Sequence, residues 1–323
     1  MSVTNELVSR TATVPADMAG QRVDRAAATI WADYSRSRIQ QWIESGELTV
    51  DGSAAVRSQR LKGGETLAIE AELEPVLELA PEPIPIEVIY EDSEIIVVDK
   101  PAGLVVHPGA GNPSGTLLNA LLHFDRSLNL VPRAGLVHRL DKDTSGLLVV
   151  ARNLSAQQAL AAMLERRQIK RVYRAVCQTV LTGGGVIDAP IDRNPRDRTR
   201  MAVREGGRPA RTYYRLVERF RAHSHVELEL ETGRTHQIRV HMAHIRAPLV
   251  GDPVYGGRPR LPPHPSDALR RELQGFSRQA LHAMRLELAH PAEGRPLKFT
   301  SPLPEDFEHL LAVLRGDLEA AQA

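Results

Sequence analysis

An acidic stretch that is rich in proline divides the chain and most constrains how it folds. Pro75, Pro81, Pro83 and Pro85 lie within residues 70–87. Prolines at this spacing exclude a regular helix, because each one removes a backbone donor. They favour an extended chain instead. We therefore expect an interdomain linker here, with a small module before it and a larger unit after it.

The segment before the linker predicts two helices followed by short strands. Apolar residues recur at helical spacing across residues 24–32, and a second helix is predicted over Arg38–Glu44. The strand Leu48–Val50 is followed by Asp51-Gly52, a strong hairpin signal. Residues 67–69 form the expected closing strand.

After the linker, strand-like runs dominate. Strands are predicted at 88–90, 95–99, 147–151, 172–178, 210–220 and 226–231. Helices are predicted at 116–124, 155–167, 235–245 and 305–315, the first three capped by Thr116, Ser155 and Thr235. Because few helices separate the strands, we predict an α+β fold with a mixed, mostly antiparallel sheet. The expected division is an extension at 1–20, a small α/β module at 21–80 and a main domain at 81–323.

Composition excludes several classes of protein. The single cysteine, Cys177, excludes disulfides, iron–sulfur clusters and cysteine-based zinc sites, and is typical of a reducing compartment. No apolar run approaches the ~20 residues that span a bilayer. The polar N-terminus lacks the apolar core of a secretory signal. We therefore expect a cytoplasmic protein without a membrane segment.

The net charge of +1 conceals opposed regions. Residues 65–99 carry eleven acidic residues and no Lys or Arg, whereas residues 130–180 carry a net charge of +6 and residues 191–260 a net charge of +7. Of the 41 cations 36 are arginines, which suit bidentate phosphate contacts, although a coding bias gives the same count. The near-neutral total therefore does not exclude a polyanionic partner, because the two basic regions could bind one.

The densest cluster of reactive side chains is the segment 135–146, which precedes a predicted buried strand. Asp141 lies between Arg139 and Lys142, whose charges favour its ionised form. An ionised carboxylate held in place can act as a nucleophile. On composition alone, a polar turn with internal hydrogen bonds is the commoner interpretation.

A second cluster, at 231–241, places Arg234 at a predicted helix start, where backbone amides favour an anion. That anion is either a phosphate or the Asp141 carboxylate. His236, His241 and His244 suggest a metal, but no accompanying base fits a metalloprotease pattern, and we assign no metal site. Tyr173 lies among arginines, which suits either a half-buried core position or stacking on an extruded base.

The small module presents four arginines on and before its helices. These are Arg22, Arg25, Arg36 and Arg38. They form either a solvated face or a patch that follows RNA phosphates.

Several motifs together resemble the RluA-type pseudouridine synthases. The segment 138–147, His-Arg-Leu-Asp-Lys-Asp-Thr-Ser-Gly-Leu, is similar to the signature of that family. It is joined by the segments 106–113, 171–175, 231–244, 251–257 and 279–283, in the family's order. The N-terminal module resembles an S4 RNA-binding domain.

The resemblance implies that the protein isomerises uridines in large-subunit (23S) ribosomal RNA, free or in an assembling 50S subunit. It implies an extruded target base in a stem-loop at the subunit interface, no cofactor and a monomer. Asp141 matches the nucleophile, Tyr173 the active-site tyrosine, and Arg234 the partner of Asp141. Further substrate contacts are expected from Arg139, Ile238, Arg239 and His236.

Other functions remain open at this stage. A non-catalytic RNA-binding assembly factor would use the same basic surfaces, and a synthase of the same family could act on another RNA. A carboxylate glycosidase would need a second carboxylate ~5–9.5 Å from Asp141, and Asp143 is the nearest in sequence.

Overall fold

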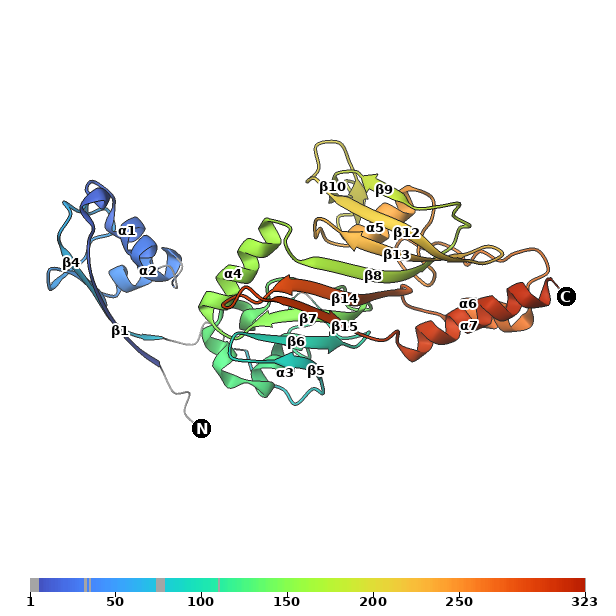
Figure 1. Cartoon of the computed structure of the whole chain (residues 1–323), viewed down its shortest axis with the longest axis horizontal. Helices are drawn as coiled ribbons and strands as arrows, with labels where there is room; N and C mark the ends of the chain where they lie inside the picture. The colour runs from blue at the N-terminus through green and yellow to red at the C-terminus, as the bar shows by residue number, and fades with distance from the viewer. Residues whose placement is uncertain (1–5, 32–33, 35, 74–78, 110, 323) are drawn as a thin grey trace.

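The computed structural model describes residues 6–31, 34, 36–73, 79–109 and 111–322. These residues form an N-terminal module and a larger domain, and Figure 1 shows the module in blue at one end of the molecule. Residue 32 of the first predicted helix and Pro75 of the predicted linker lie outside the described residues.

The N-terminal module packs two helices on a four-stranded antiparallel sheet with strand order β1-β4-β2-β3. Its elements are β1 (Glu6–Thr13), α1 (Val23–Ile30), α2 (Arg36–Glu44), β2 (Leu48–Val50), β3 (Ser53–Ala54) and β4 (Thr66–Leu73). Trp42, Ile39 and Leu48 are buried between the layers. The predicted hairpin at Asp51-Gly52 is present, with φ of 50° and 77°, the left-handed values that a two-residue turn needs.

Strand β1 corrects the predicted division of the chain. The sequence analysis treats residues 1–20 as an extension, yet β1 pairs with β4 along its whole length, from Glu6 opposite Leu73 to Thr13 opposite Thr66. The same pairing extends β4 to Leu73, so the predicted linker start at residue 70 is wrong. Pairing with a strand more than 50 residues away leaves no local signal in the sequence.

The larger domain is built on a nine-stranded sheet with the order β5-β6-β7-β14-β8-β13-β12-β9, and β15 pairs with β14. Its strands are β5 (Glu87–Glu91), β6 (Ile95–Lys100), β7 (Ser145–Ala151), β8 (Lys170–Cys177), β9 (Gly185–Asp188), β12 (Arg211–Arg219), β13 (Ser224–Leu230), β14 (Leu281–Ala289) and β15 (Pro296–Thr300). A separate ribbon pairs β10 (Ile191–Arg193) with β11 (Met201–Val203).

Every pair in the large sheet is antiparallel except β7 with β14, which is parallel. The predicted α+β class with a mixed, mostly antiparallel sheet is therefore confirmed. The parallel pair is close: a Cβ on Gly146 would lie 2.3 Å from the Ala283 carbonyl oxygen. Gly146 also has a φ of 112°, so only glycine fits at the start of this strand.

Helices cover both faces of this sheet. They are α3 (Leu117–Phe124), α4 (Leu154–Glu165), α5 (Gln237–His244), α6 (Asp267–Gly275) and α7 (Glu305–Ala320), and Figure 1 shows α6 and α7 side by side at the end opposite the N-terminal module. Short 3₁₀ turns occur at Ala16–Met18, Arg126–Leu130 and Pro132–Gly135. Among the described residues, none of the helices has the length and apolar character needed to cross a membrane.

Of the three predicted caps one is confirmed. Thr116 caps α3, reciprocally with Asn119. Helix α4 is capped by Asn153 instead of Ser155, because an asparagine two residues earlier reaches the amide of Ala156. Helix α5 begins after His236, whose φ is 56°, and not at Thr235.

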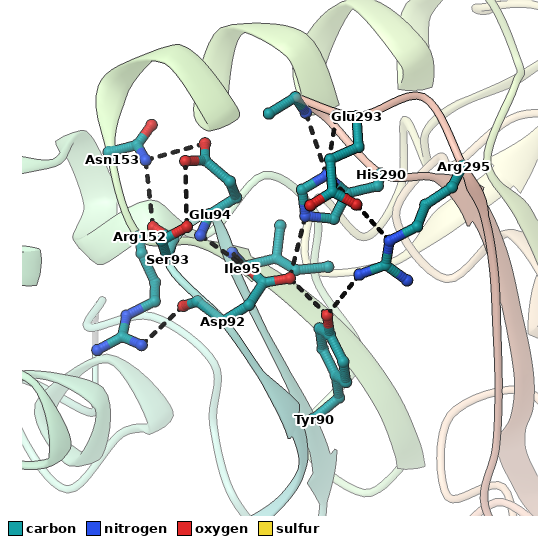
Figure 2. A network of polar contacts seen from close by, with 11 residues as sticks. Tyr90, Asp92, Ser93, Glu94, Ile95, Arg152, Asn153, His290, Glu293 and Arg295 are labelled. Atoms are coloured by element: carbon teal, nitrogen blue, oxygen red, sulfur yellow. Dashed lines mark hydrogen bonds and ion pairs between the residues drawn. The ribbon is translucent and has the colours of Figure 1, made fainter.

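A polar network fixes the corner between β5 and β6, at the opposite end of β7 from residue 145 (Figure 2). Asp92 accepts hydrogen bonds from Tyr90, from the amides of Glu94 and Ile95, and from His290. Burial raises the pKa of Asp92, but these hydrogen bonds outweigh it and lower the pKa to about 2. The network ties the β5–β6 corner to the β14–β15 connection.

Candidate active site

The polar loop 136–144 leads into β7 with its two leucines buried and with Arg139 and Lys142 exposed. Leu136 forms a bridge to Val150 of β7, and Leu140 is buried. Arg139 is exposed, and Asp141 lines a small cavity of about 50 Å³. The other six predicted site residues of this domain line the same cavity: Arg139, Tyr173, Arg234, His236, Ile238 and Arg239. The structure thus brings together side chains from three separate segments of the chain, 139–141, 173 and 234–239.

The ion-pair partner of Asp141 is Arg239. Arg239 Nη1 lies 3.0 Å from Asp141 Oδ2. The predicted pair with Arg234 is wrong: Arg234 Nε donates to the Pro209 carbonyl at 3.1 Å. Arg234 precedes α5, whereas Arg239 lies on the buried side of that helix and reaches into the cavity.

Asp252 holds Arg239 from the other side. Its carboxylate receives Arg239 Nε at 2.7 Å and Nη2 at 2.8 Å, and Oδ1 also accepts the amides of Val254 and Tyr255. Burial alone would lower the pKa of Arg239, but the bonds and charge of Asp252 and the charge of Asp141 outweigh it and raise the pKa. The guanidinium is therefore permanently charged and rigidly aimed at Asp141.

Sequence reasoning did not assign a role to Asp252. The Gly-Asp-Pro-Val-Tyr-Gly-Gly run at 251–257 was one of the resembling motifs, but a carboxylate in a turn carries no signal of its distant partner. The side chain of Asp252 is fully buried. A buried acid in a chain with many arginines is the signal that points to an internal ion pair.

Tyr173 and Ile238 supply the apolar wall of the cavity. Tyr173, on β8, is 5% exposed and Ile238, on α5, is 4% exposed. Burial is the largest cause that raises the pKa of Tyr173, so the phenol is neutral at physiological pH. A flat aromatic surface beside a charged carboxylate suits an unstacked nucleobase.

His236 connects the site to a second tyrosine. Its Nδ1 lies 3.0 Å from Tyr255 Oη, which also accepts the amide of Met201 at 2.9 Å. Its Nε2 lies 3.9 Å from Asp141 Oδ1. Burial is the main cause that lowers the pKa of His236, which keeps the ring neutral.

The remaining histidines of this segment do not converge with His236. His241 is fully buried, with Nδ1 2.9 Å from Thr212 Oγ1 and Nε2 2.9 Å from the Ala189 carbonyl. Across residues 6–31, 34, 36–73, 79–109 and 111–322, no group of three His, Cys, Asp or Glu side chains is placed to hold a metal ion. His241 is thus a core histidine with both nitrogens hydrogen-bonded.

The four arginines of the N-terminal module divide into two kinds. Arg22 and Arg36 both donate to the Asp24 carboxylate, at 3.1 Å and 2.8 Å, and Asp24 is fully buried. Arg25 is exposed and Arg38 is half-buried. The heads of Arg22 and Arg36 stay about half exposed, so they can still meet a solvent-side partner.

Lys100, at the end of β6, fixes the backbone of the active-site loop. Its Nζ donates to the carbonyls of Pro101, Leu104 and Lys142, at 2.7, 3.0 and 2.9 Å. The side chain is fully buried, and burial lowers its pKa to about 7. Because Lys142 follows Asp141 directly, this lysine positions the carboxylate through the main chain.

We predict that Lys100→Met destabilises the protein by roughly 2–4 kcal/mol, because three backbone carbonyls lose their shared donor while the apolar stem is retained. Urea unfolding monitored by circular dichroism measures the change. Lys298→Met, at an exposed position of β15, is the matched control. Equal unfolding free energies for the two variants would contradict the assigned role of Lys100.

Comparisons with known proteins agree with this geometry. Residues 94–244 match the family model described as RNA pseudouridylate synthase. The chain is 56% identical over 308 residues to "Ribosomal large subunit pseudouridine synthase D" of Xanthomonas campestris pv. campestris, which covers 95% of this chain and 93% of that protein. The protein of the same name from Pseudomonas aeruginosa is 54% identical over 98% of this chain and 99% of its own length.

A solved structure has the same fold. Human RNA pseudouridylate synthase domain containing 4 superposes with a TM-score of 0.56 at 27% identity, over 71% of this chain and 93% of that one. Asp141, Tyr173 and Arg239 all lie within residues 94–244, the part of the chain that the family model matches. With relatives above 50% identity along nearly its whole length, this chain belongs to the RNA pseudouridylate synthase family.

Proposed function

We propose that this enzyme converts uridines of large-subunit ribosomal RNA to pseudouridine, with Asp141 as the nucleophile. The observation that carries the proposal is the geometry at Asp141: a carboxylate held by Arg239 in a cavity beside Tyr173 and Ile238. The substrate class is supported by two relatives above 50% identity, both named for the large ribosomal subunit.

The reaction detaches uracil from the ribose at N1, turns the base and joins it again through C5. The C5 proton leaves and N1 gains a proton, so no oxidant, reductant or cofactor is needed. Asp141 Oδ2 accepts Arg239, which leaves Oδ1 to attack either C1′ of the ribose or C6 of the ring. The fixed positive charge of Arg239, 3.0 Å away, holds the carboxylate in place for that step.

Other residues of the cavity receive the flipped nucleotide. Tyr173 stacks on the uracil and Ile238 closes the apolar side of the pocket. Arg139, exposed at the rim, contacts the RNA backbone or fills the space that the base leaves. Arg234 lies at the same rim, with a role in RNA binding instead of the carboxylate pair.

The N-terminal module supplies a second RNA contact in this proposal. It is an S4-like domain whose arginines, Arg22, Arg25, Arg36 and Arg38, bind phosphates. Such contacts hold the enzyme on a structured RNA without reading its sequence. We place the enzyme in the cytoplasm with the ribosomal RNA, acting as a monomer.

Tritium release tests the proposal directly. Large-subunit ribosomal RNA transcribed with [5-³H]uridine loses tritium to water whenever a uridine is isomerised, so the purified protein is expected to release it, and mapping of pseudouridine then locates the sites. RNA binding without release would identify a non-catalytic assembly factor. Release only from another RNA would identify a synthase of different specificity.

A further inference from the structure

Arg171, on β8, is a buried cation without a partner. The residue is 8% exposed, and its Nε is buried with no hydrogen-bond acceptor. Within the described residues, no carboxylate lies within ion-pair distance of its guanidinium, and it has no further polar contact. The position is two residues before Tyr173, so both side chains project from the same face of the strand.

The other buried guanidinium of the site shows what Arg171 lacks. Arg239 is 4% exposed and donates hydrogen bonds to two carboxylates, those of Asp141 and Asp252. An unpaired charge in such surroundings is destabilising, because burial removes water without supplying a partner. An arginine left unpaired at such a position is a candidate for binding an anion from outside the protein.

Gly233 marks where the anion would lie. A Cβ built on Gly233 would be 2.7 Å from Arg171 Nη1, so the absence of a side chain makes room for the guanidinium. Gly233 itself is exposed, and Arg234 follows it. The local charge is positive: burial, then the charges of Arg208 and Arg167, lower the pKa of Arg234.

Glu231, the acid two residues before Gly233, is already occupied. Glu231 pairs with Arg167 and with Arg211, and it also accepts the hydroxyl of Tyr213. It therefore has little capacity left to neutralise the guanidinium beside Gly233. Arg171 thus lies beside the exposed Gly233, and Arg234 follows that glycine in the chain. Glu231 does not compensate the charges of these two arginines.

We propose that Arg171 and Arg234 form a subsite for one phosphate of the RNA backbone, at Gly233, next to the nucleotide in the cavity. The inference rests on the proposed function for its ligand. A guanidinium pairs with phosphate oxygens in a bidentate manner, and an exposed glycine lets the backbone approach. Arg171 does not line the cavity of Asp141, so its ligand is the phosphate outside and not the reacting base.

Equilibrium binding of a fluorescein-labelled stem-loop transcript of large-subunit ribosomal RNA tests the subsite. Arg171→Gln is expected to weaken binding roughly tenfold, the size of one hydrogen-bonded charge contact. The slope of log K against log salt should become shallower by about 0.7–0.9, the value for one lost phosphate contact. Because the guanidinium is unpaired in the free protein, the variant should unfold at the same temperature as the wild type or a higher one.

Two further variants make the test specific. Gly233→Ala keeps the charge but displaces the flexible end of Arg171, so it should weaken binding in the same direction by a smaller factor. Arg315→Gln removes the same charge from α7, where Arg315 pairs with Glu218, and should leave affinity and salt slope unchanged.

Three outcomes would overturn the subsite: an unchanged affinity and salt slope in Arg171→Gln, a fall in the single-turnover rate at unchanged affinity, or a lower unfolding temperature with unchanged affinity. A slower reaction at unchanged affinity would indicate that Arg171 acts on the base. A lower unfolding temperature at unchanged affinity would indicate a structural role. If the wild type released no tritium, the proposed reaction would be contradicted but the subsite would not, because the binding measurement does not depend on turnover.

Discussion

Asp141→Asn is expected to abolish pseudouridine formation while RNA binding persists. The amide keeps the shape of the carboxylate and one oxygen for Arg239, but it lacks the charge that makes a nucleophile. Loss of a nucleophile lowers turnover by roughly three orders of magnitude or more. Tritium release under single-turnover conditions measures the loss, and fluorescence anisotropy measures binding.

Asp143→Asn is the matched control, since it removes a carboxylate from the same loop two residues away. It should retain most of the turnover, which also tests the glycosidase alternative that needs a second acid. Mass spectrometry excludes deamidation of the new asparagine. Substantial turnover by intact Asp141→Asn would remove the nucleophile assignment.

Arg239→Met is expected to impair both folding and catalysis. The substitution leaves Asp252 as an unpaired charge at a fully buried position, and breaking a buried pair in this way costs about 3–5 kcal/mol. Asp141 loses its positioning contact at the same time. Urea unfolding gives the stability change, and the single-turnover rate, corrected for the folded fraction, gives the catalytic change.

The pH dependence of the free energy of unfolding identifies the cause of the stability loss in Arg239→Met. In the wild type burial raises the pKa of Asp252, but Arg239 outweighs burial and the pKa is lowered, so the pair stabilises above the ordinary carboxyl pKa and is lost in acid. Without Arg239 only the amides of Val254 and Tyr255 oppose the effect of burial, so the pKa of Asp252 is higher than in the wild type and the variant loses less stability in acid. The stability difference should therefore be smaller at pH 5 than at pH 8.

Arg315→Met is the control for this variant, because Arg315 forms a bidentate pair with Glu218 at an exposed position of α7. Exposed pairs contribute ~0–1 kcal/mol. A stability loss in Arg239→Met no larger than in this control would contradict the assigned role of Asp252.

Local signals in the sequence sufficed for much of the fold. Thr116 with its helix, the Asp51-Gly52 hairpin and the continuous apolar run of β7 were all predicted, because each depends on neighbours within a few residues. The strands β1, β14 and β15 were not predicted as such. Each is defined by its pairing with another strand.

The site was predictable in its residues but not in its pairing. Asp141 and Arg239 were both recognised, yet Arg234 was assigned as the partner. The choice depends on where α5 begins: His236 adopts the left-handed conformation, and this sets which side chains of the helix face inward. A shift of a single residue at a helix start turns every later side chain by 100°, and short-range patterns do not resolve such a shift.

The parallel pairing of β7 with β14 has a consequence for the newly made chain. Ser145, at the end of the active-site loop, pairs with His282, and Ser145 Oγ lies 2.9 Å from His282 Nδ1. The two residues are 137 positions apart, so this contact forms only after most of the polypeptide has left the ribosome. Because pairing distant segments costs loop-closure entropy before the contact is formed, we expect the active-site loop of a partly synthesised chain to lack this contact until β14 has been made.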